Sequence, residues 1–372
     1  MSIGGYRLLK NINKIFISQT IRKASTKAEV NFQKRIFSGI QPTGGVHLGN
    51  YLGAILNWVK IQNEHSNITL SIVDLHSITL PQESEILKKR ILEMTATLLA
   101  CGIDPDKSTL FLQSTVPQHT QLCWQLSCLT TMARLAHLPQ YKEKSEKLKD
   151  IPLGLFIYPV LQAADILVHK ATHVPVGEDQ AQQIQLAQHL AKIFNTKYGT
   201  TFPIPHAIIA DDTSSRIRNL RNPTKKMSKS EPDPKSRIQL SDTSDAILEK
   251  VKKAVTDFTS EVYYDAENRP GVSNLMVIHS MLTGLSMEEI YQDANSKKLD
   301  TGKYKLVVAE AVANHLAPIR EKINNYLSRP QYIYDILEEG RIHATEVAQK
   351  TLDEVNLKVG TILNTENNFV VS

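Results

Sequence analysis

Short apolar segments alternate with helix-length amphipathic segments from residue 36 onward, and this alternation limits the fold more than any other feature of the chain. Three segments have the pattern of buried strands: RIFSGI (35–40), ITLSIVD (68–74) and TLFLQS (109–114). Helical periodicity lies between and after them, over about 47–64, 83–101 and 119–135. Strands separated by helices pair in parallel through crossover connections. We therefore expect an α/β domain with a parallel sheet.

The residues directly after these strands are where we expect a ligand site, because open parallel sheets bind ligands beyond the carboxyl ends of their strands. GIQPTGG (39–45) follows the first strand and DLHS (74–77) follows the second. PVGEDQ (175–180) follows a further strand that we predict at about 172–175. These three segments are therefore expected to lie together at one edge of the sheet.

A second, all-helical domain is predicted after the sheet. From Ser244 to about Leu352 apolar residues recur at helical spacing, interrupted at ENRPGVS (267–273) and LSRPQ (327–331). We therefore predict an α/β domain at 33–235 and a helical domain at 236–355. The tail, 356–372, carries too little apolar pattern to assign.

The amino terminus carries the chain's excess of positive charge. Eight basic residues against the single acid Glu29 give the first 35 residues a net charge of +7, whereas the whole chain carries +5. Arg7, Lys10 and Lys14 recur at helical spacing among apolar side chains, which is typical of an amphipathic, acid-poor transit peptide. We predict a mitochondrial transit peptide at 1–30 and hence a mitochondrial matrix protein. The alternative is a basic arm that contacts nucleic acid.

Two classes of structure are not expected from the composition. No apolar run approaches the length of a membrane span, so we expect no contact with a membrane. Cys101, Cys123 and Cys128 form no CxxC pair, so we expect neither a disulfide framework nor a structural metal. Cys123 and Cys128 lie in the apolar helical pattern QLCWQLSCL (121–129), and we predict that both are small core residues.

The loop after the first strand is rich in glycine. Four glycines lie within residues 39–49, directly before a helix, where a bare backbone can approach a polyanion at the positive helix terminus. Such a loop alone is a weak signal, because many turns in α/β domains contain glycine. The sequence His47-Leu-Gly49-Asn50 strengthens it. Its imidazole and amide are suited to phosphate oxygens, and its glycine leaves room for an adenine ring.

A second polar loop is Lys226-Met-Ser-Lys229-Ser230, which is bounded by prolines. Two lysines and two hydroxyls form a cationic clamp that suits the β- and γ-phosphates of ATP as negative charge builds on departing pyrophosphate. A lysine-rich loop by itself is equally typical of a solvated surface. Its occurrence together with HLGN, and in this order, favours the clamp.

HLGN (47–50) and KMSKS (226–230), about 180 residues apart, resemble the two signatures of class I aminoacyl-tRNA synthetases. Five blocks resemble tryptophanyl-tRNA synthetases of the bacterial and organellar type: FSGIQPTGGVHLGNYLGA, SIVDLHSIT, YPVLQAADIL, HVPVGEDQ and NPTKKMSKSEPDPK. The similarity extends to about Leu316. Asn50 replaces the last histidine of the usual first signature, a departure that is itself usual among the tryptophan enzymes. The resemblance implies a Rossmann-like catalytic domain followed by a helical anticodon-binding domain.

The resemblance also assigns site residues. For ATP it implies Gln41, Pro42, Thr43, Gly49 and Asn50 after the first strand, Gly177, Glu178 and Asp179 on the ribose side, the backbone of Ile217 at the adenine, and Lys226, Met227, Ser228, Lys229 and Ser230 at the phosphates. For tryptophan it implies Asp165, Tyr158, His76, Gln180 and Phe37. His47, Asn50, Lys226, Lys229 and Gln41 are expected to be catalytic.

Asp165 is the residue on which the choice of amino acid depends. AADILV embeds it among apolar residues, and a buried acid without a partner is costly. An acid that accepts the indole N–H would reject a phenyl ring, because the acceptor is then left unpaired. Gln162 stands where many relatives have methionine, so Asp165 is the firmer of the two as a ring contact.

The resemblance implies a two-step reaction that uses ATP, with Mg²⁺ held through the ATP, on L-tryptophan and tRNA(Trp), by a homodimer. A tyrosyl-tRNA synthetase shares the fold and both signatures, but GEDQ and Asp165 count against it. A non-catalytic RNA-binding protein would have no need of HLGN, GEDQ and KMSKS together. A small-molecule nucleotidyltransferase would leave the helical segment after Ser244 unexplained.

Overall fold

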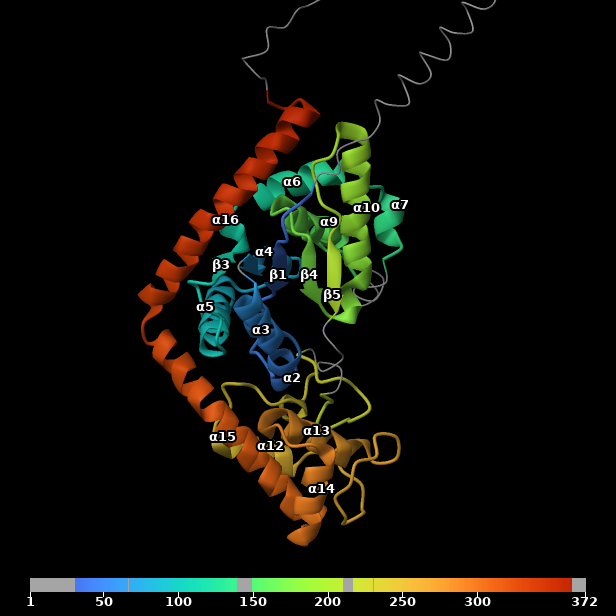
Figure 1. Cartoon of the computed structure of the whole chain (residues 1–372), viewed down its shortest axis with the longest axis vertical. Helices are drawn as coiled ribbons and strands as arrows, with labels where there is room; N and C mark the ends of the chain where they lie inside the picture. The colour runs from blue at the N-terminus through green and yellow to red at the C-terminus, as the bar shows by residue number, and fades with distance from the viewer. Residues whose placement is uncertain (1–30, 66, 139–148, 210–216, 230, 363–372) are drawn as a thin grey trace, which may run out of the picture. The chain divides into compact units, whose positions relative to one another are not determined.

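The structure, a computed structural model, describes five stretches of the chain: 31–65, 67–138, 149–209, 217–229 and 231–362. By its internal contacts the chain divides into Met1–Gln33 and a large compact unit, Lys34–Ser372. All helices and strands that the structure describes belong to the large unit (Figure 1). The predicted transit peptide at 1–30, Ser230 and most of the 356–372 tail lie outside the described residues.

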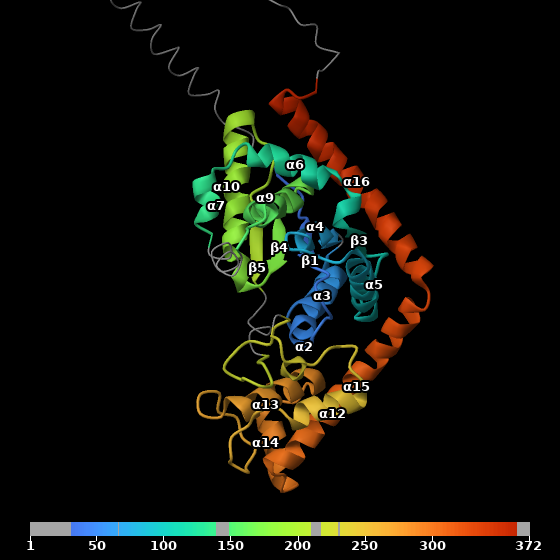
Figure 2. The same cartoon turned by 180° about the vertical axis from the view of Figure 1, so that it is seen from behind.

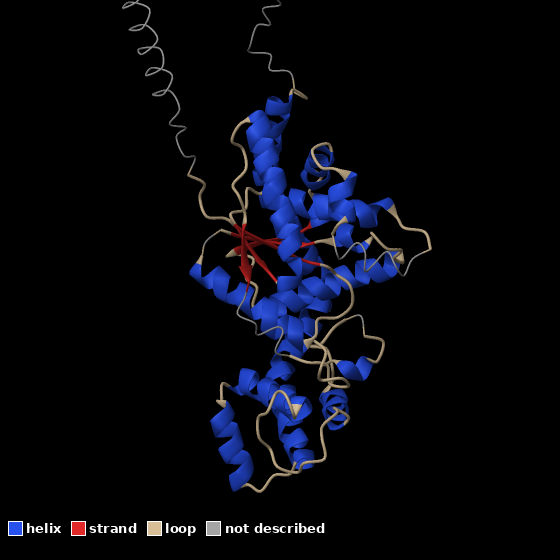
Figure 3. Ribbon diagram, turned by 90° about the vertical axis from the view of Figure 1, so that its right-hand side faces the viewer, coloured by secondary structure: helices blue, strands red, loops and turns tan. Residues whose placement is uncertain are grey.

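A five-stranded parallel sheet lies at the centre of the α/β part (Figure 3). Its strands are β1 (Ile36–Ile40), β2 (Ile68–Ile72), β3 (Ser108–Leu112), β4 (His173–Val176) and β5 (His206–Ile209). They lie in the order β3-β2-β1-β4-β5, and every neighbouring pair is parallel. The chain moves outward from β1 on one side and returns to its other side with β4, which is the doubly wound arrangement. The α/β, Rossmann-like expectation is confirmed.

The fifth strand has no counterpart among the predicted strands. β5 is four residues long, HAII, and three of its four residues are exposed because it forms an edge of the sheet. The predicted strands β1, β2 and β3 are five-residue apolar runs that are mostly buried, as parallel strands between two helical layers are, and β4 has its two central residues buried. A four-residue strand at an exposed edge carries a weaker signal, and Pro203 and Pro205 directly before it interrupt the apolar run.

Helices cover both faces of the sheet. In chain order they are α2 (Leu48–Asn50), a π-helical turn (Tyr51–Ile55), α3 (Leu56–Glu64), α4 (Asp74–Ser77), α5 (Ser84–Ala100), α6 (Gln118–Ser127), α7 (Met132–Ala136), α9 (Leu153–Val168) and α10 (Ala181–Tyr198). The helix predicted at 83–101 is confirmed by α5. The segment predicted at 47–64 is helical but contains the π turn.

Two predictions around residue 128 are wrong. The single helix expected at 119–135 is split into α6 and α7, because the Thr131 hydroxyl accepts a hydrogen bond from the Arg134 N–H and starts a new helix there. Cys128, expected in the core, is exposed at the carboxyl end of α6, whereas Cys123 is buried as expected. Helical periodicity predicted that Cys128 lies on the buried apolar face of the helix, but α6 ends at Ser127, so that face does not continue to Cys128.

The carboxyl-terminal part is helical, as predicted. It consists of α12 (Ser244–Lys252), α13 (Pro270–Thr283), α14 (Met287–Ser296), α15 (Thr301–Leu327) and α16 (Pro330–Val359). α16 packs against β3 and α6, and Figures 1 and 2 show it running from the end of α15 past the sheet. A Cβ atom at Gly340 of α16 would lie 1.9 Å from the carbonyl oxygen of Leu110 in β3. Only glycine allows this approach.

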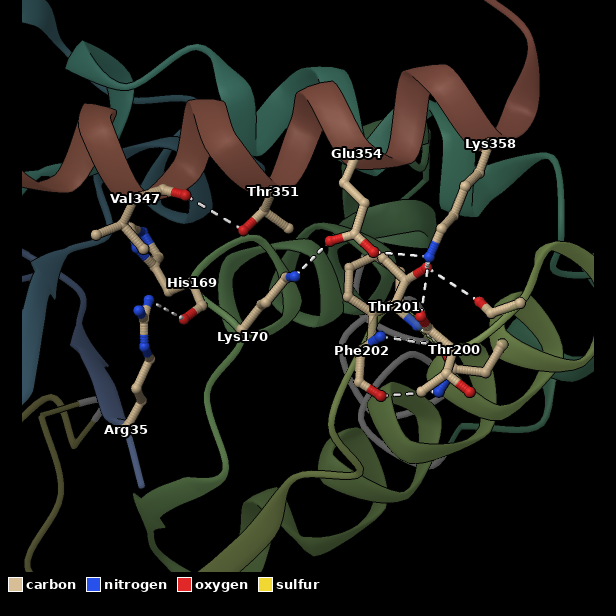
Figure 4. Close-up of polar contacts among 12 residues, drawn as sticks. Arg35, His169, Lys170, Thr200, Thr201, Phe202, Val347, Thr351, Glu354 and Lys358 are labelled. Atoms are coloured by element: carbon tan, nitrogen blue, oxygen red, sulfur yellow. Dashed lines mark hydrogen bonds and ion pairs between the residues drawn. The ribbon is translucent and has the colours of Figure 1, made fainter. Parts of the chain in front are cut away.

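Ion pairs fasten the second half of α16 to the α/β part (Figure 4). Glu354 accepts hydrogen bonds from Lys170, just after α9, at 2.5 Å and from Lys358 at 2.6 Å. Lys358 also donates to the carbonyl oxygen of Thr200. Burial would raise the pKa of Glu354, but these two lysines hold it below its usual value. Within the described residues, no helix is long and apolar enough to cross a membrane.

Candidate functional site

The site lies where the strand order reverses. β1 and β4 are neighbours in the sheet although His173 and its partner Ile36 are 137 positions apart in the sequence, and helical crossovers leave the two strands in opposite directions. The loop 41–47 follows β1 and the segment 177–180 follows β4. Loops that diverge at such a switch point leave a crevice at the carboxyl ends of the strands. Both predicted ATP-binding segments therefore lie at the point where such a crevice is expected.

His47 begins the helix that follows β1. The Asn50 N–H donates to Nδ1 of His47 at 3.2 Å, and the His47 N–H donates to Oδ1 of Asn50 at 3.4 Å. This is a capping box: the imidazole of His47 accepts from the backbone N–H of Asn50, and the side-chain amide oxygen of Asn50 accepts from the backbone N–H of His47. Because Nδ1 accepts, a neutral His47 carries its proton on Nε2. The two polar residues of HLGN thus shape the turn, and one N–H remains to bind a ligand.

The electrostatic surroundings keep His47 uncharged. Its side chain is buried, and burial together with the positive charges of Lys229, Arg237 and Lys226 lowers its pKa to about 3. A neutral imidazole can still donate a hydrogen bond from Nε2 to a phosphate oxygen. The arrangement therefore provides a neutral donor beside fixed cations.

Gly49 is closely packed against the imidazole of His47. A Cβ atom there would lie 3.2 Å from both Cε1 and Nδ1 of His47 and 3.7 Å from Cβ of Met227. The glycine therefore lets the capping imidazole fold back over the helix and lets the second signature approach the first. Its predicted role in making room for adenine stays a prediction.

Main-chain pairing holds the first signature against the segment that follows the second, and it fixes the second signature beside Ile217. Leu48 donates to the carbonyl of Ile238 at 2.8 Å, and Leu240 donates to that of Val46 at 3.0 Å. Met227, which is 2 % exposed, donates its N–H to the carbonyl of Ile217 at 3.1 Å. The backbone of Ile217, expected at the adenine, is thus held beside KMSK.

The two lysines of the second signature differ in environment. Lys226 is exposed, whereas Lys229 is partly buried, and burial together with the positive charge of Arg90 on α5 lowers the pKa of Lys229 to about 8. Ser228 lies between them on the same loop, and Ser230 lies outside the described residues. The described part of the loop holds both cations near HLGN, as the clamp requires.

The remaining predicted ATP residues occupy the two loops at the switch point. Pro42 is buried, Thr43 half-buried and Gln41 exposed in the loop after β1. After β4, Gly177 is half-buried, and Glu178 and Asp179 are exposed in a short 3₁₀ turn (Glu178–Gln180). Gln180, expected at tryptophan, donates to Oδ2 of Asp179 at 2.7 Å and accepts from Nε2 of Gln162 at 3.2 Å.

Asp165 lies on α9, 2 % exposed, and three side chains donate to it. Nδ1 of His119 and Nε2 of Gln113 lie 2.6 and 2.7 Å from Oδ1, and Nε2 of His76 lies 2.8 Å from Oδ2. Burial would raise the pKa of Asp165, but the hydrogen bonds from His119 and His76 outweigh it and hold the pKa below its usual value. The carboxylate is thus an ionised, buried acceptor.

The other predicted tryptophan residues lie around this carboxylate. Tyr158, buried on the same helix, meets the His76 ring edge to face with the centroids 6.2 Å apart. Phe37 of β1 is buried and stacks on His169, with the centroids 5.3 Å apart and the planes 14° apart. The structure therefore brings Asp165, His76 and Tyr158 into one cluster, and it links Phe37 to that cluster through His169.

Sequence reasoning missed three residues of this cluster. Gln113 follows β3, His119 lies on α6, and His169 ends α9; all three are buried. Gln113 could have been found, because it stands directly after a predicted strand like the other site segments. His119 and His169 had no such signal, since a single histidine in a helical segment is usually unremarkable.

Comparison with known proteins identifies what this chain is similar to. Residues 31–317 match the model of a family described as tRNA synthetases class I (W and Y). The mitochondrial tryptophan–tRNA ligase of Caenorhabditis elegans is 47 % identical over 87 % of this chain and 90 % of its own length. The tryptophan–tRNA ligase of Wolinella succinogenes is 46 % identical over 89 % of this chain and 99 % of its own length.

A solved structure agrees with these relatives. The crystal structure of tryptophanyl-tRNA synthetase from Campylobacter jejuni complexed with ADP and tryptophan superposes with a TM-score of 0.76 and 32 % identity. The match covers 88 % of this chain and 99 % of that one.

Proposed function

Because the chain belongs to the family of class I tRNA synthetases for tryptophan and tyrosine, we propose that it is the tryptophan–tRNA ligase of a mitochondrion. It activates L-tryptophan with ATP to tryptophanyl-adenylate and transfers the amino acid to tRNA(Trp). Two observations carry the proposal together: Gly49 of HLGN lies against Met227 of KMSK, and the buried carboxylate of Asp165 accepts hydrogen bonds from His76 and Gln113, which follow β2 and β3. This arrangement combines a phosphate site with an acceptor for a ring N–H.

Two displacements make up the reaction. A carboxylate oxygen of tryptophan attacks the α-phosphorus of ATP, and the bond to the bridging oxygen breaks as pyrophosphate leaves. A hydroxyl of the terminal tRNA ribose then attacks the carbonyl carbon of the mixed anhydride, and AMP leaves. The protein forms no covalent bond, so catalysis consists of positioning and charge stabilisation.

The phosphate side is assigned to three groups. Nε2–H of neutral His47 donates to a phosphate oxygen, and Lys226 and Lys229 stabilise the charge that grows on pyrophosphate. Gln41 and Thr43 line the same crevice from the loop after β1, and the 177–180 turn faces the ribose. Mg²⁺ would be held through the ATP phosphates, where it would neutralise part of their charge. ADP in the Campylobacter relative supports the use of ATP.

The tryptophan side is assigned to Asp165 and its neighbours. A carboxylate offers about four acceptor positions, and three donors occupy two at Oδ1 and one at Oδ2. The remaining position, on Oδ2 beside His76, accepts the indole N–H. Tyr158 and Gln180 lie toward the amino acid, and Phe37 contacts the ring.

Amino-acid-dependent ATP–pyrophosphate exchange tests the activity. The purified full chain is expected to exchange with tryptophan and not with tyrosine. Asp165→Ala is expected to lower kcat/KM for tryptophan about 30- to 1,000-fold, the effect of removing a buried charged hydrogen bond, with ATP binding nearly unchanged. Exchange driven by tyrosine alone would place the chain with the tyrosine enzymes instead. Full tryptophan activity and full discrimination in a folded Asp165→Ala variant would contradict the pocket.

The mitochondrial assignment is supported by the basic, acid-poor first 30 residues and by the mitochondrial relative from Caenorhabditis elegans. Import is expected to fail when residues 1–30 are deleted and when Arg7, Lys10 and Lys14 are all changed to Glu, while aminoacylation stays intact. Lost aminoacylation with intact import would favour the alternative of a basic arm for RNA.

The domain division and the assembly complete the proposal. The catalytic domain is assigned to 33–235 and anticodon binding to the helical domain at 236–355. The chain acts as a homodimer, which sedimentation equilibrium tests directly: a single species at the monomer mass over the working concentration range would rule it out.

A further inference from the structure

We propose that His119 and His169 form a buried positioning relay that orients Asp165, and that this relay sets the discrimination of the pocket for an indole ring. The inference rests on the proposed function, because it concerns the same tryptophan site. Neither histidine is expected to touch the substrate; each acts through its neighbour. The relay joins Phe37 on β1 and His119 on α6 to two residues at the carboxyl end of α9, Asp165 and His169.

The relay is a continuous chain of short contacts. Nδ1 of His119 lies 2.6 Å from Oδ1 of Asp165, and Nε2 of His119 lies 3.2 Å from Nε2 of His169. His119 is 0 % exposed and His169 is 4 % exposed. Water therefore has little access to either ring, and the two histidines depend on each other for their hydrogen bonds.

Proton bookkeeping fixes the orientation of His119. An ionised carboxylate only accepts, so Nδ1 of His119 must carry a proton. Two imidazole nitrogens at 3.2 Å need one N–H between them. Either His169 donates to a neutral His119, or a charged His119 donates to His169. His169 itself stays neutral, because burial lowers its pKa well below its usual value. In both cases Nδ1–H of His119 points at Asp165.

Aromatic packing prevents the two rings from turning. Phe37 stacks on His169 with the planes 14° apart, and the Phe111 ring lies 5.6 Å from the centroids of both His119 and His169. Phe111 is fully buried. Phe37 is also a predicted contact of the tryptophan ring, so the packing that holds the relay is continuous with the proposed pocket.

The consequence for specificity follows from the acceptor positions of Asp165. His119 and Gln113 both donate to Oδ1, which leaves the open position on Oδ2. Without His119 the carboxylate retains one donor on each oxygen, Gln113 on Oδ1 and His76 on Oδ2, so Oδ1 also offers an open acceptor position. The acceptor position for the indole N–H is then no longer confined to Oδ2, and the pocket discriminates less between an indole ring and a phenyl ring.

Three variants separate positioning from simple stability. His119→Leu removes one of the three donors to Asp165, and His119→Asn retains an N–H near the place of Nδ1–H. His119→Leu combined with His169→Leu removes both rings, so neither is left as an unpaired buried partner. His279→Leu is the matched control, because His279 is also buried and makes one hydrogen bond, to Tyr304 at 3.2 Å in the helical part.

Each variant is measured in the full chain. The quantities measured are kcat, the KM for tryptophan, the KM for ATP, and the discrimination ratio, which is kcat/KM for tryptophan divided by kcat/KM for phenylalanine. His119→Leu and the double variant are expected to raise the tryptophan KM by about 10- to 100-fold and to lower the ratio by a similar factor, with the ATP KM within about 2-fold. His119→Asn is expected to stay within about 3-fold of wild type. His279→Leu is expected to lower the melting temperature without changing the ratio.

Two results would overturn the relay. One is wild-type discrimination in a folded double variant, which would make both histidines purely structural. The other is a His279→Leu variant that narrows discrimination as much as His119→Leu, which would make the effect a general loss of stability. A wild-type chain without tryptophan-dependent exchange would overturn the proposed function and the relay together, and this outcome is distinguishable because it appears before any variant is made.

Discussion

Lys229 is expected to give the activation reaction an alkaline limit near pH 8. Burial and the nearby charge of Arg90 lower its pKa to about 8, and a lysine stabilises phosphate charge only while protonated. The group is charged below its pKa and neutral above it, so the clamp weakens as pH rises. At pH 9 only about one Lys229 side chain in eleven would carry its charge, and kcat/KM for ATP should be about tenfold below its plateau.

The choice of kinetic constant matters, because kcat/KM reports ionisations of the free enzyme and kcat those of the complex. The phosphates of bound ATP favour the charged ammonium, so the limit in kcat is expected at higher pH than the limit in kcat/KM. Lys229→Ala should lower the activation rate about 100-fold at neutral pH with tryptophan binding unchanged, as a transition-state contact does.

Lys229→Arg provides the decisive comparison. A guanidinium stays charged over the whole range, so this variant should lose the alkaline limit even if its plateau rate is lower. Lys225→Arg, at an exposed lysine on the same loop, should keep the wild-type limit. The assay is ATP–pyrophosphate exchange between pH 6.5 and 9.5. A limit that persists in Lys229→Arg at the wild-type position would refute the assignment to Lys229.

Two further predictions concern stability. Gly340→Ala is expected to destabilise the fold by about 2 kcal/mol or more in urea unfolding, because its Cβ would lie 1.9 Å from the carbonyl oxygen of Leu110. This cost outweighs the better helix propensity of alanine. Gly154→Ala is the control and should be neutral or slightly stabilising, because its Cβ would lie 3.9 Å from the nearest atom. His47 has a folded pKa of about 3, so below pH 6.5 the unfolded chain binds a proton that the folded chain does not, and stability falls as pH falls. Between pH 7 and 5 this proton lowers the free energy of unfolding by about 2 kcal/mol, so the His47→Asn variant should lose about 2 kcal/mol less stability than the wild type over the same range. An equal loss of stability in both proteins would show that His47 is not the group responsible.

Local chemistry explains which parts of the fold could be predicted from the sequence. The apolar runs of β1 to β4 and the helix α5 carry their periodicity within a few residues. The HLGN turn is also local, because the capping box of His47 and Asn50 joins residues three apart. β5 was missed because its apolar run, HAII, is only four residues long, and the break between α6 and α7 was missed because a single capping threonine outweighs a helical pattern.

The sequence by itself determined the alternation of the first four strands with helices, the two signature loops and the acid at position 165, since each depends on neighbours along the chain. Only the tertiary structure decided the chemistry of these groups. Asp165 takes its donors from residues 46, 52 and 89 positions away, and the lowered pKa of His47 depends on burial and on cations about 180 residues along the chain. Burial and charge act through space, so ionisation and orientation are set by segments that no local pattern connects.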